Sequence, residues 1–271
     1  MPIVNEGPLA DACDDLPLWS APFGIALLET VRLRQGLTLL DVGCGAGFPL
    51  LELAQRLGRE ARAHGVDPSS AALACAQRKC EARELTNVQL HQAVAEALPL
   101  ADCSVDIIVS NNGLNNVSSL DRAVAECARV ARPSAQLVFT FNLPGTMHLI
   151  YATLRRVLEE RGDAGASDRI ASHISARRKS VDFMCTVVEH AGFRVACARE
   201  DRFLLKFSCA GALFDHAFVR AMFLRPWLEL VAEHQRATVF GELETRLDIV
   251  AQSQGDLSLD VPFACVDATR A

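Results

Sequence analysis

The sequence predicts an α/β fold built on a parallel β-sheet, and three observations support this prediction. Between residues 37 and 141, short apolar runs of strand length alternate with segments of helical periodicity. Such alternation is typical of parallel strands joined by right-handed helical crossovers. The first strand run ends in a glycine-rich turn over residues 43–47. The 271 residues are 50% hydrophobic and 22% charged, with a mean hydropathy of +0.17, which is the composition of a folded chain with a sizeable core.

Five apolar runs are predicted to form the strands of this sheet. They cover residues 37–42, 63–67, 88–92, 105–110 and 136–141. Helices are predicted between them over residues 49–61, 69–84 and 119–131. Pro49 suits a first helical turn, Ser69 or Ser70 is a typical N-cap, and Pro133 follows the third helix.

After Pro144 and Gly145 the sequence is predicted to be mostly helical. Helices are expected over residues 146–162 and 168–190, followed by two strands at 193–198 and 202–207 that are close enough for a hairpin. Beyond Ser208 the pattern is helical again. Pro226 interrupts it, and a last helix is predicted over residues 227–250. With no repeats and no low-complexity linker, we expect one domain with helical additions.

Composition and charge exclude several classes of protein. The 27 Lys and Arg against 33 Asp and Glu give a net charge of −6, which disfavours nucleic-acid and anionic-membrane partners. The basic run Arg177-Arg178-Lys179 is interpreted as a solvated helix end. No apolar stretch approaches the length of about 20 residues that spans a membrane. No His, Glu and Cys residues have zinc-ligand spacing, so no metal is expected.

The cysteines and the N-terminal residues bear on the cellular compartment. Ten cysteines occur without a Cys-x-x-Cys pair, and most lie in apolar runs, where a thiol behaves as a small hydrophobe. Residues 1–16 contain four acidic residues and no basic one, unlike a signal peptide. We therefore expect reduced thiols and a cytoplasmic protein.

The glycine-rich turn is the most informative motif. Gly43, Gly45 and Gly47 follow a predicted strand and precede a predicted helix, where the absence of Cβ atoms lets a ligand approach the backbone. A dinucleotide-binding loop needs its third glycine at position 48 to seat a pyrophosphate, and that position is Phe48. The spacing therefore predicts a cradle for a nucleoside.

Two aspartates accompany this turn. Asp67 ends the second predicted strand, where a carboxylate can accept hydrogen bonds from both ribose hydroxyls; the alternative is a helix-capping role before Pro68. Asp41 lies in the first strand. Its carboxylate is expected either to accept loop N–H groups or to hold an ammonium group of the ligand.

These residues resemble the class I S-adenosylmethionine-dependent methyltransferases, in the small-molecule branch that includes the quinone-biosynthesis type. The resemblance covers residues 36–142, and a weaker match lies at residues 189–193. Beyond the glycine turn it rests on the segments 95–102, 104–112 and 128–133. One departure is Val94, where the family often has an Asp that receives the adenine amino group.

The resemblance implies a Rossmann-like, seven-stranded, mostly parallel sheet whose antiparallel last strand comes from the hairpin at 193–207. It also implies a helical lid at 1–35 and a core at 36–207 with a helical insertion at 146–190. Residues 208–271 are then a C-terminal helical extension, which either caps the substrate pocket or forms a homodimer face.

The resemblance further implies S-adenosylmethionine as the cofactor. The adenine is expected on the Ala95 backbone and on Glu96, and Trp19 is expected in the lid, with plain packing of its helix as the alternative. The complete set of predicted cofactor-binding residues is Trp19, Asp41, Gly43, Cys44, Gly45, Gly47, Asp67, Pro68, Ala95, Glu96, Asn111 and Asn112.

Methyl transfer from a sulfonium needs an in-line approach in a dry pocket, and needs a base only if the acceptor loses a proton. Asn115 and Asn142 follow the fourth and fifth strands, where they either bind the substrate or stabilise turns. His148 is the best-placed base, although a helix-face histidine with no partner is the favoured alternative. All three are candidate catalytic residues.

The predicted function is methyl transfer to a small organic acceptor. The alternatives are a non-catalytic nucleoside-binding protein of the same fold and a nucleotide-dependent oxidoreductase, which Phe48 disfavours. The first would bind the cofactor weakly or without turnover, whereas the second would bind NAD(H).

Overall fold

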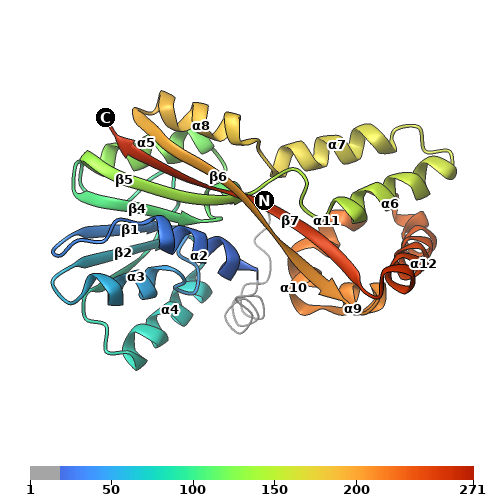
Figure 1. Cartoon of the computed structure of the whole chain (residues 1–271), viewed down its shortest axis with the longest axis horizontal. Helices are drawn as coiled ribbons and strands as arrows, with labels where there is room; N and C mark the ends of the chain where they lie inside the picture. Colours follow the sequence, from blue (N-terminus) through green and yellow to red (C-terminus); the bar gives the residue numbers. More distant parts are fainter. Residues whose placement is uncertain (1–18) are drawn as a thin grey trace. The chain divides into compact units, whose positions relative to one another are not determined.

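The computed structural model describes residues 19–271, which contain a seven-stranded β-sheet in the order β3-β2-β1-β4-β5-β7-β6 (Figure 1). The predicted α/β fold class is therefore confirmed. The predicted strands are found at β1 (Thr38–Val42), β2 (Arg62–Asp67), β3 (Val88–Gln92), β4 (Val105–Asn111) and β5 (Ala131–Asn142). They pair in parallel, so their carboxyl ends, at Val42, Asp67 and Asn111 among others, lie along one edge.

Helices pack their apolar faces against this sheet. The helices are α2 (Ser20–Thr30), α3 (Leu50–Leu57), α4 (Ser70–Ala82), η1 (Leu114–Asn116), α5 (Leu120–Val130) and α8 (Val181–His190). Helix α3 buries Leu50, Leu53 and Leu57 at helical spacing and contacts β1 and β2. Ser69 caps α4, as predicted, by accepting a hydrogen bond from the Ala72 N–H at 3.2 Å.

The described chain divides into two compact units. Unit 1 comprises residues 19–142, 179–201 and 263–271, and unit 2 comprises residues 143–178 and 202–262. These units do not follow linear boundaries at residues 35 and 207, because the long strands β6 (Phe193–Phe207) and β7 (Leu257–Arg270) each have residues in both. The lid role predicted for residues 1–35 stays a prediction, and residues 1–18 lie outside the described residues.

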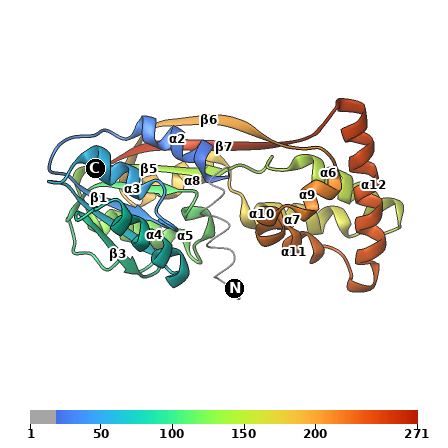
Figure 2. The same cartoon turned by 90° about the horizontal axis from the view of Figure 1, so that it is seen from below.

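Unit 2 is helical. Its helices are α6 (His148–Glu160), α7 (Ala166–Arg177), α9 (Ala210–Asp215), α10 (Ala217–Val219), the π-helical η2 (Arg220–Leu224), α11 (Arg225–Leu228), η3 (Glu233–Gln235) and α12 (Arg236–Gln254). The 19-residue α12, drawn in red in Figure 2, packs on α6 and α9. Tyr151 and Trp227 are the largest fully buried side chains of this unit.

The antiparallel strand of the sheet differs from the predicted one. Residues 193–207 form the single strand β6 and not a hairpin, and the strand antiparallel to β5 is β7, which lies within the predicted helical extension. The middle of β6 is Arg-Glu-Asp-Arg, which contains neither glycine nor proline, and β6 is an edge strand with mostly exposed side chains. In β7, Leu257, Leu259 and Val261 alternate as buried residues, a period-2 pattern that the sequence already contained.

Three helix predictions also need correction. The helix expected at 168–190 is split into α7 and α8, because Ser180 starts a new helix by capping the Phe183 N–H at 3.3 Å. The helix expected at 227–250 is divided into α11, η3 and α12. Arg178, expected in a solvated helix end, is only 4% exposed, whereas its neighbour Arg177 is exposed.

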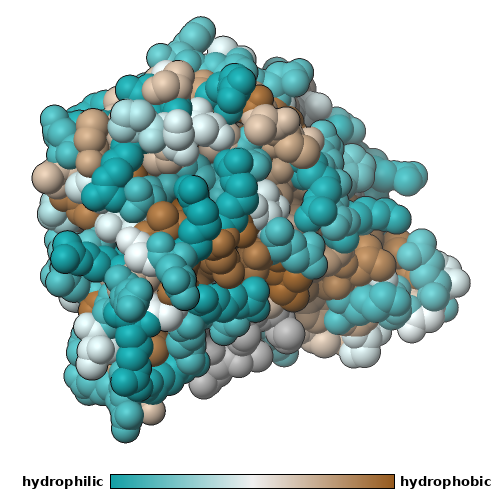
Figure 3. All heavy atoms as spheres, turned by 60° about the vertical axis from the view of Figure 1, so that its left-hand side comes forward, coloured by the Kyte–Doolittle hydropathy of each residue, from teal (hydrophilic) through white to brown (hydrophobic). Residues whose placement is uncertain are grey.

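The face of the molecule drawn in Figure 3 is mostly polar. Hydrophilic side chains make up most of the face drawn in Figure 3, with apolar side chains exposed between them. Among the helices of residues 19–271, none combines the length and the apolar character required to cross a membrane.

Candidate functional site

The turn after β1 is built by backbone hydrogen bonds to the neighbouring strand. The N–H groups of Gly43 and Cys44 both donate to the Val66 carbonyl of β2, at 2.8 and 3.1 Å. The Cys44 side chain is 1% exposed, and burial is the main cause that raises its thiol pKa. Cys44 is therefore a packing residue beneath the turn, and its contribution to a ligand comes from its backbone.

The three glycines of this turn have different roles. All have positive φ angles, at +79° for Gly43, +51° for Gly45 and +103° for Gly47. A Cβ on Gly43 would lie 3.0 Å from the Gly113 Cα, and one on Gly47 would lie 2.7 Å from the Leu51 Cδ1. A Cβ on Gly45 would meet no atom within 4 Å. Gly43 and Gly47 are thus required for packing, whereas Gly45 borders open space that a ligand can use.

Asp67 organises the turn from the end of β2. Its Oδ2 accepts a hydrogen bond from the Gly45 N–H at 2.9 Å, and its Oδ1 accepts one from the Ser69 N–H at 2.9 Å. Burial raises the pKa of this carboxyl, and the two N–H donors oppose that shift. The cap of α4 is Ser69, so Asp67 orders the turn that leads into the helix without capping it, and ribose binding stays a prediction. Pro68, which follows, is exposed.

Asp41 is a buried carboxyl without a hydrogen-bond partner. It is fully buried in β1, and neither carboxylate oxygen makes a hydrogen bond in the described structure. Burial and, to a lesser extent, the charge of Asp67 raise its pKa to about 8, against an opposing effect of the Leu50 N–H. Of the two predicted roles, acceptance of loop N–H groups is not realised by any hydrogen bond. The carboxyl remains available for a cationic group of a ligand.

Asn111, at the end of β4, connects three elements. Its Nδ2 donates to the Ser20 carbonyl of α2 at 3.1 Å, and its Oδ1 accepts from the Thr140 Oγ1 of β5 at 2.9 Å. The amide predicted to contact the cofactor is thus occupied within the protein. A backbone contact from Asn111 to the cofactor stays a prediction.

The other asparagines converge, although they come from different segments. The Asn115 Nδ2 donates to the Asn142 Oδ1 at 2.7 Å and also to the Asn112 Oδ1. The Asn142 N–H donates to the same Asn112 oxygen at 3.3 Å, and Asn112 has a φ of +59°. The Asn115 Oδ1 is buried without a donor. The structure therefore brings these three predicted residues together and leaves one acceptor available for a ligand.

The segment after β3 carries the two residues predicted to read adenine. Ala95 is buried, and the Glu96 Oε1 accepts a hydrogen bond from the Ser119 N–H at 2.9 Å, next to the start of α5. Glu96 thus positions its segment against α5, and its adenine contact stays a prediction.

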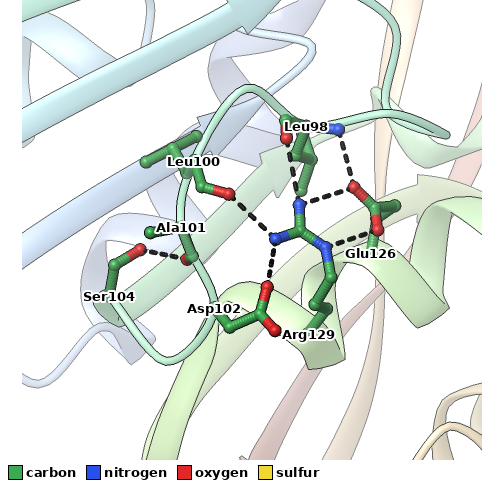
Figure 4. Close-up of polar contacts among 7 residues, drawn as sticks. All are labelled: Leu98, Leu100, Ala101, Asp102, Ser104, Glu126 and Arg129. Carbon is green, nitrogen blue, oxygen red and sulfur yellow. Dashed lines mark hydrogen bonds and ion pairs between the residues drawn. The ribbon is translucent and has the colours of Figure 1, made fainter.

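Arg129 of α5 fixes the same segment further along (Figure 4). Its guanidinium donates to the Leu98 and Leu100 carbonyls at 3.0 and 2.9 Å, and to Glu126 and Asp102. The Glu126 Oε2 also accepts from the Leu98 N–H at 2.8 Å. These contacts of Arg129 were not predicted as part of the site. The one indication in the sequence was that Arg129 lies in segment 128–133, which carries part of the family resemblance.

Helix α2 meets the glycine turn through a contact that sequence reasoning missed. A Cβ on Gly24 would lie 2.2 Å from the Phe48 Cε1, so the Phe48 ring fills the place that Gly24 leaves empty. Phe23 is fully buried, with its ring centroid 4.9 Å from that of Phe263. Trp19 precedes the helix, 5.6 Å from the Phe23 ring. The helix is packed as the alternative interpretation expected, and a cofactor contact from Trp19 stays a prediction.

His148 is not part of this constellation. It is the exposed first residue of α6 in unit 2, and no side-chain hydrogen bond is found for it among residues 19–271. This is the favoured alternative, a helix-face histidine, and its role as a base stays a prediction. Within the described range, no group of three or more metal-ligating side chains is present.

Comparisons with known proteins identify the type of domain. A family model described as a methyltransferase domain matches residues 40–139. The demethylmenaquinone methyltransferase of Listeria welshimeri is 30% identical over 135 residues, which cover 48% of this chain and 57% of that protein. The chain thus spans about half the length of the curated relatives that it matches.

Solved structures agree on the fold. A SAM-dependent methyltransferase from Aquifex aeolicus is 25% identical with a TM-score of 0.50, covering 65% of this chain and 81% of that one. The YcgJ protein from Bacillus subtilis is 17% identical with a TM-score of 0.59, covering 92% and 98%. Residues 40–139 are thus similar to the methyltransferase domain family, and the chain shares the fold of an S-adenosylmethionine-dependent methyltransferase.

The residues present fit the cofactor of this family. The space beside Gly45 admits a ligand at the backbone, and the buried Asp41 carboxyl lacks the partner that a ligand ammonium would supply. Both lie next to Asp67, at the carboxyl ends of parallel strands, where open α/β sheets bind their ligands.

Proposed function

We propose that the protein transfers a methyl group from S-adenosylmethionine to a small organic acceptor. The observation that carries this proposal is the open position at Gly45, between the buried, unpartnered Asp41 and the N–H-accepting Asp67. An open glycine position beside two carboxylates suits a ligand that carries both a ribose and an ammonium group.

Each residue has a defined role in this proposal. Asp67 accepts the ribose hydroxyls, Asp41 holds the ammonium group, and the Ala95 backbone with Glu96 borders the adenine. When bound, S-adenosylmethionine supplies a methyl group already activated by its sulfonium. The chain then has to orient the acceptor for in-line displacement and exclude water.

The asparagine cluster is the proposed acceptor-binding group. The unpartnered Asn115 Oδ1 accepts a hydrogen bond from an O–H or N–H group of the acceptor, while Asn112 and Asn142 hold the Asn115 amide in place. Methylation of such a group replaces its proton with the methyl group, and the released proton goes to solvent.

Calorimetric titration with S-adenosylmethionine and S-adenosylhomocysteine tests the cofactor, with NAD(H) as the control. We expect binding of the first two ligands with micromolar affinity, about −8 kcal/mol, and no binding of NAD(H). Binding followed by turnover in a screen of small phenols, amines and thiols supports the transferase. Binding without turnover of any acceptor favours the non-catalytic nucleoside-binding protein, and NAD(H) binding refutes the proposal.

We further propose that the protein works in the cytoplasm on a small-molecule substrate, without a nucleic-acid or membrane partner, and that it forms a homodimer. All cysteines within residues 19–271 are free thiols, which suits a reducing compartment. Light scattering of the purified chain tests the dimer, and cell fractionation tests the compartment. A monomeric mass or a membrane-bound fraction would contradict the respective proposal.

A further inference from the structure

Unit 2 contains a buried arginine without an anionic partner. Arg178 follows the end of α7 and is only 4% exposed, yet no carboxylate lies within ion-pair distance of it among the described residues. Its Nη1 donates to the Tyr151 hydroxyl at 3.2 Å, and its Nε is buried without an acceptor. A buried guanidinium normally has a paired anion, because desolvation of an unpaired charge costs several kcal/mol.

Further hydrogen-bond donors surround the same tyrosine. The Arg178 Cζ lies 5.3 Å from the centre of the Tyr151 ring, and the Trp227 ring packs edge-on against it, with centroids 6.3 Å apart. The Trp227 Nε1 is buried and has no acceptor. Arg155, one helical turn after Tyr151, also has a buried Nε without an acceptor. Three N–H donors from three segments of unit 2 therefore lack an acceptor.

The charge of this cluster suits an anion. The Nε2 of His173 lies 3.2 Å from the Tyr151 hydroxyl oxygen. Burial and the neighbouring Arg177 and Arg178 lower the His173 pKa to about 4, against a smaller opposing effect of Glu229. His173 is consequently neutral near pH 7, and Arg178 is the fully buried cation of the cluster.

The surroundings of the donors are aromatic. Phe223 lies 5.5 Å from Trp227 and 5.8 Å from Phe218, measured between ring centroids. Phe223 belongs to the π-helical segment η2, a backbone form that often marks functional positions. Aromatic walls beside a buried guanidinium match a ligand that has both an apolar ring and a carboxylate.

We propose that unit 2 binds a small aromatic monocarboxylate, with Arg178 paired to the carboxylate, Trp227 N–H as a further donor, and Tyr151 and Phe223 against the ring. Phosphate is the disfavoured anion, because it has no apolar part to pack against the aromatic side chains of the cluster. This site lies entirely within unit 2, and the inference does not depend on the proposed methyl transfer.

Benzoate is the probe, and benzamide, acetate and inorganic phosphate are the comparison ligands. Trp19 and Trp227 are the two tryptophans of the chain, so the full-length Trp19→Phe protein reports on Trp227 by its fluorescence. We expect saturable benzoate binding and affinities at least about tenfold weaker for benzamide, which lacks the charge, and for acetate, which lacks the ring. Equal binding of benzamide, tighter binding of phosphate, or no binding of benzoate would overturn the proposal.

Two substitutions separate a ligand-binding arginine from a structural one. Arg178→Met is expected to weaken benzoate binding by about ten- to hundredfold, while the ligand-free variant melts at the same or a higher temperature. Arg178→Lys keeps the charge but loses the planar fork, so we expect an intermediate loss. Unchanged benzoate affinity in a folded Arg178→Met protein would refute the assignment.

If Arg178→Met does not fold, the unmodified protein still decides the question. At neutral pH, where benzoate is ionised, benzoate paired with Arg178 lies next to His173, so saturation is expected to shift the NMR signals of the His173 ring. Unchanged His173 signals under saturating benzoate would contradict the proposal. The Asp67→Ala variant provides the matched control: it impairs the proposed cofactor site of unit 1 and should bind benzoate normally.

Discussion

The affinity for S-adenosylhomocysteine is expected to depend on pH through Asp41. In the ligand-free protein, burial raises the pKa of this carboxyl to about 8, so it is mostly protonated at neutral pH. Only its ionised form attracts the ammonium group of the ligand at full strength. Raising the pH toward 8 should therefore strengthen binding, until the ligand's own α-ammonium loses its proton near the same pH.

The size of the effect follows from the two titrations. For a pKa of about 8, about one Asp41 in a hundred is ionised at about pH 6 and about one half at pH 8. With the ligand's amine about half protonated at pH 8, the affinity should be about twentyfold higher there than at pH 6. Twentyfold corresponds to about 1.8 kcal/mol, well within calorimetric reach.

The assay is calorimetric titration across this pH range, with 5′-methylthioadenosine as a ligand that lacks the ammonium group. Its affinity should stay constant, and so should the affinity of an Asp41→Asn protein for S-adenosylhomocysteine. A flat pH profile for S-adenosylhomocysteine with the unmodified protein would refute the role of Asp41. A rise that 5′-methylthioadenosine shares would assign the pH dependence to another group.

Four further predictions concern the same unit. Asp67→Ala should weaken cofactor binding by about one to a few kcal/mol. Asp67→Asn, which keeps one acceptor for the Gly45 N–H, should lose less affinity. Equal calorimetric affinities of the unmodified protein and both variants would refute the ribose assignment. Gly45→Val should abolish binding while the protein stays folded by circular dichroism, because its side chain enters the open space, so normal binding would reject the cradle. Arg129→Met should lower the free energy of unfolding by about 2 kcal/mol, because the Leu98 and Leu100 carbonyls lose a charged hydrogen-bond donor. An unchanged denaturation midpoint would contradict this prediction. Asp41→Asn should stabilise the ligand-free protein at pH 8 or above. The pKa of the Asp41 carboxyl is 3.8 in the unfolded chain and about 8 in the folded protein, so between these pH values the carboxyl takes up a proton on folding. The free energy of unfolding of the unmodified protein therefore falls as the pH rises through this range.

The parallel part of the fold could be predicted because its strands are buried. The apolar runs that became β1, β2 and β4 are short and bounded by polar or glycine residues, so their period and length identify them. The edge strand β6 gave no such signal, since most of its side chains are exposed. The alternation in β7 was present in the sequence, but residues 208–271 as a whole were expected to form a helical extension.

The backbone part of the site was predictable for a related reason. Glycine spacing and strand ends are local features, and they located Gly45, Asp67 and the asparagines that converge after β4 and β5. The contact of Phe48 with Gly24 joins residues far apart in the chain, so no local pattern indicates it. The same holds for the Glu96 contact with the Ser119 N–H.

Arg178 shows where local sequence patterns mislead, and why the structure changes its interpretation. In sequence it stands in a basic run at a helix end, where charged side chains are normally solvated. In the structure its exposure is 4%, and it is a buried ionisable group like Asp41; its Nη1 donates to the Tyr151 hydroxyl, whereas its Nε lacks an acceptor. Stability alone would favour a neutral side chain at both positions, because desolvation of an unpaired charge opposes folding. Asp41 reduces this opposition by keeping its proton, whereas a guanidinium does not give up its charge at neutral pH. The Tyr151 hydroxyl and ring compensate the Arg178 charge only in part, and the proposed anion would supply the acceptor that its buried Nε lacks.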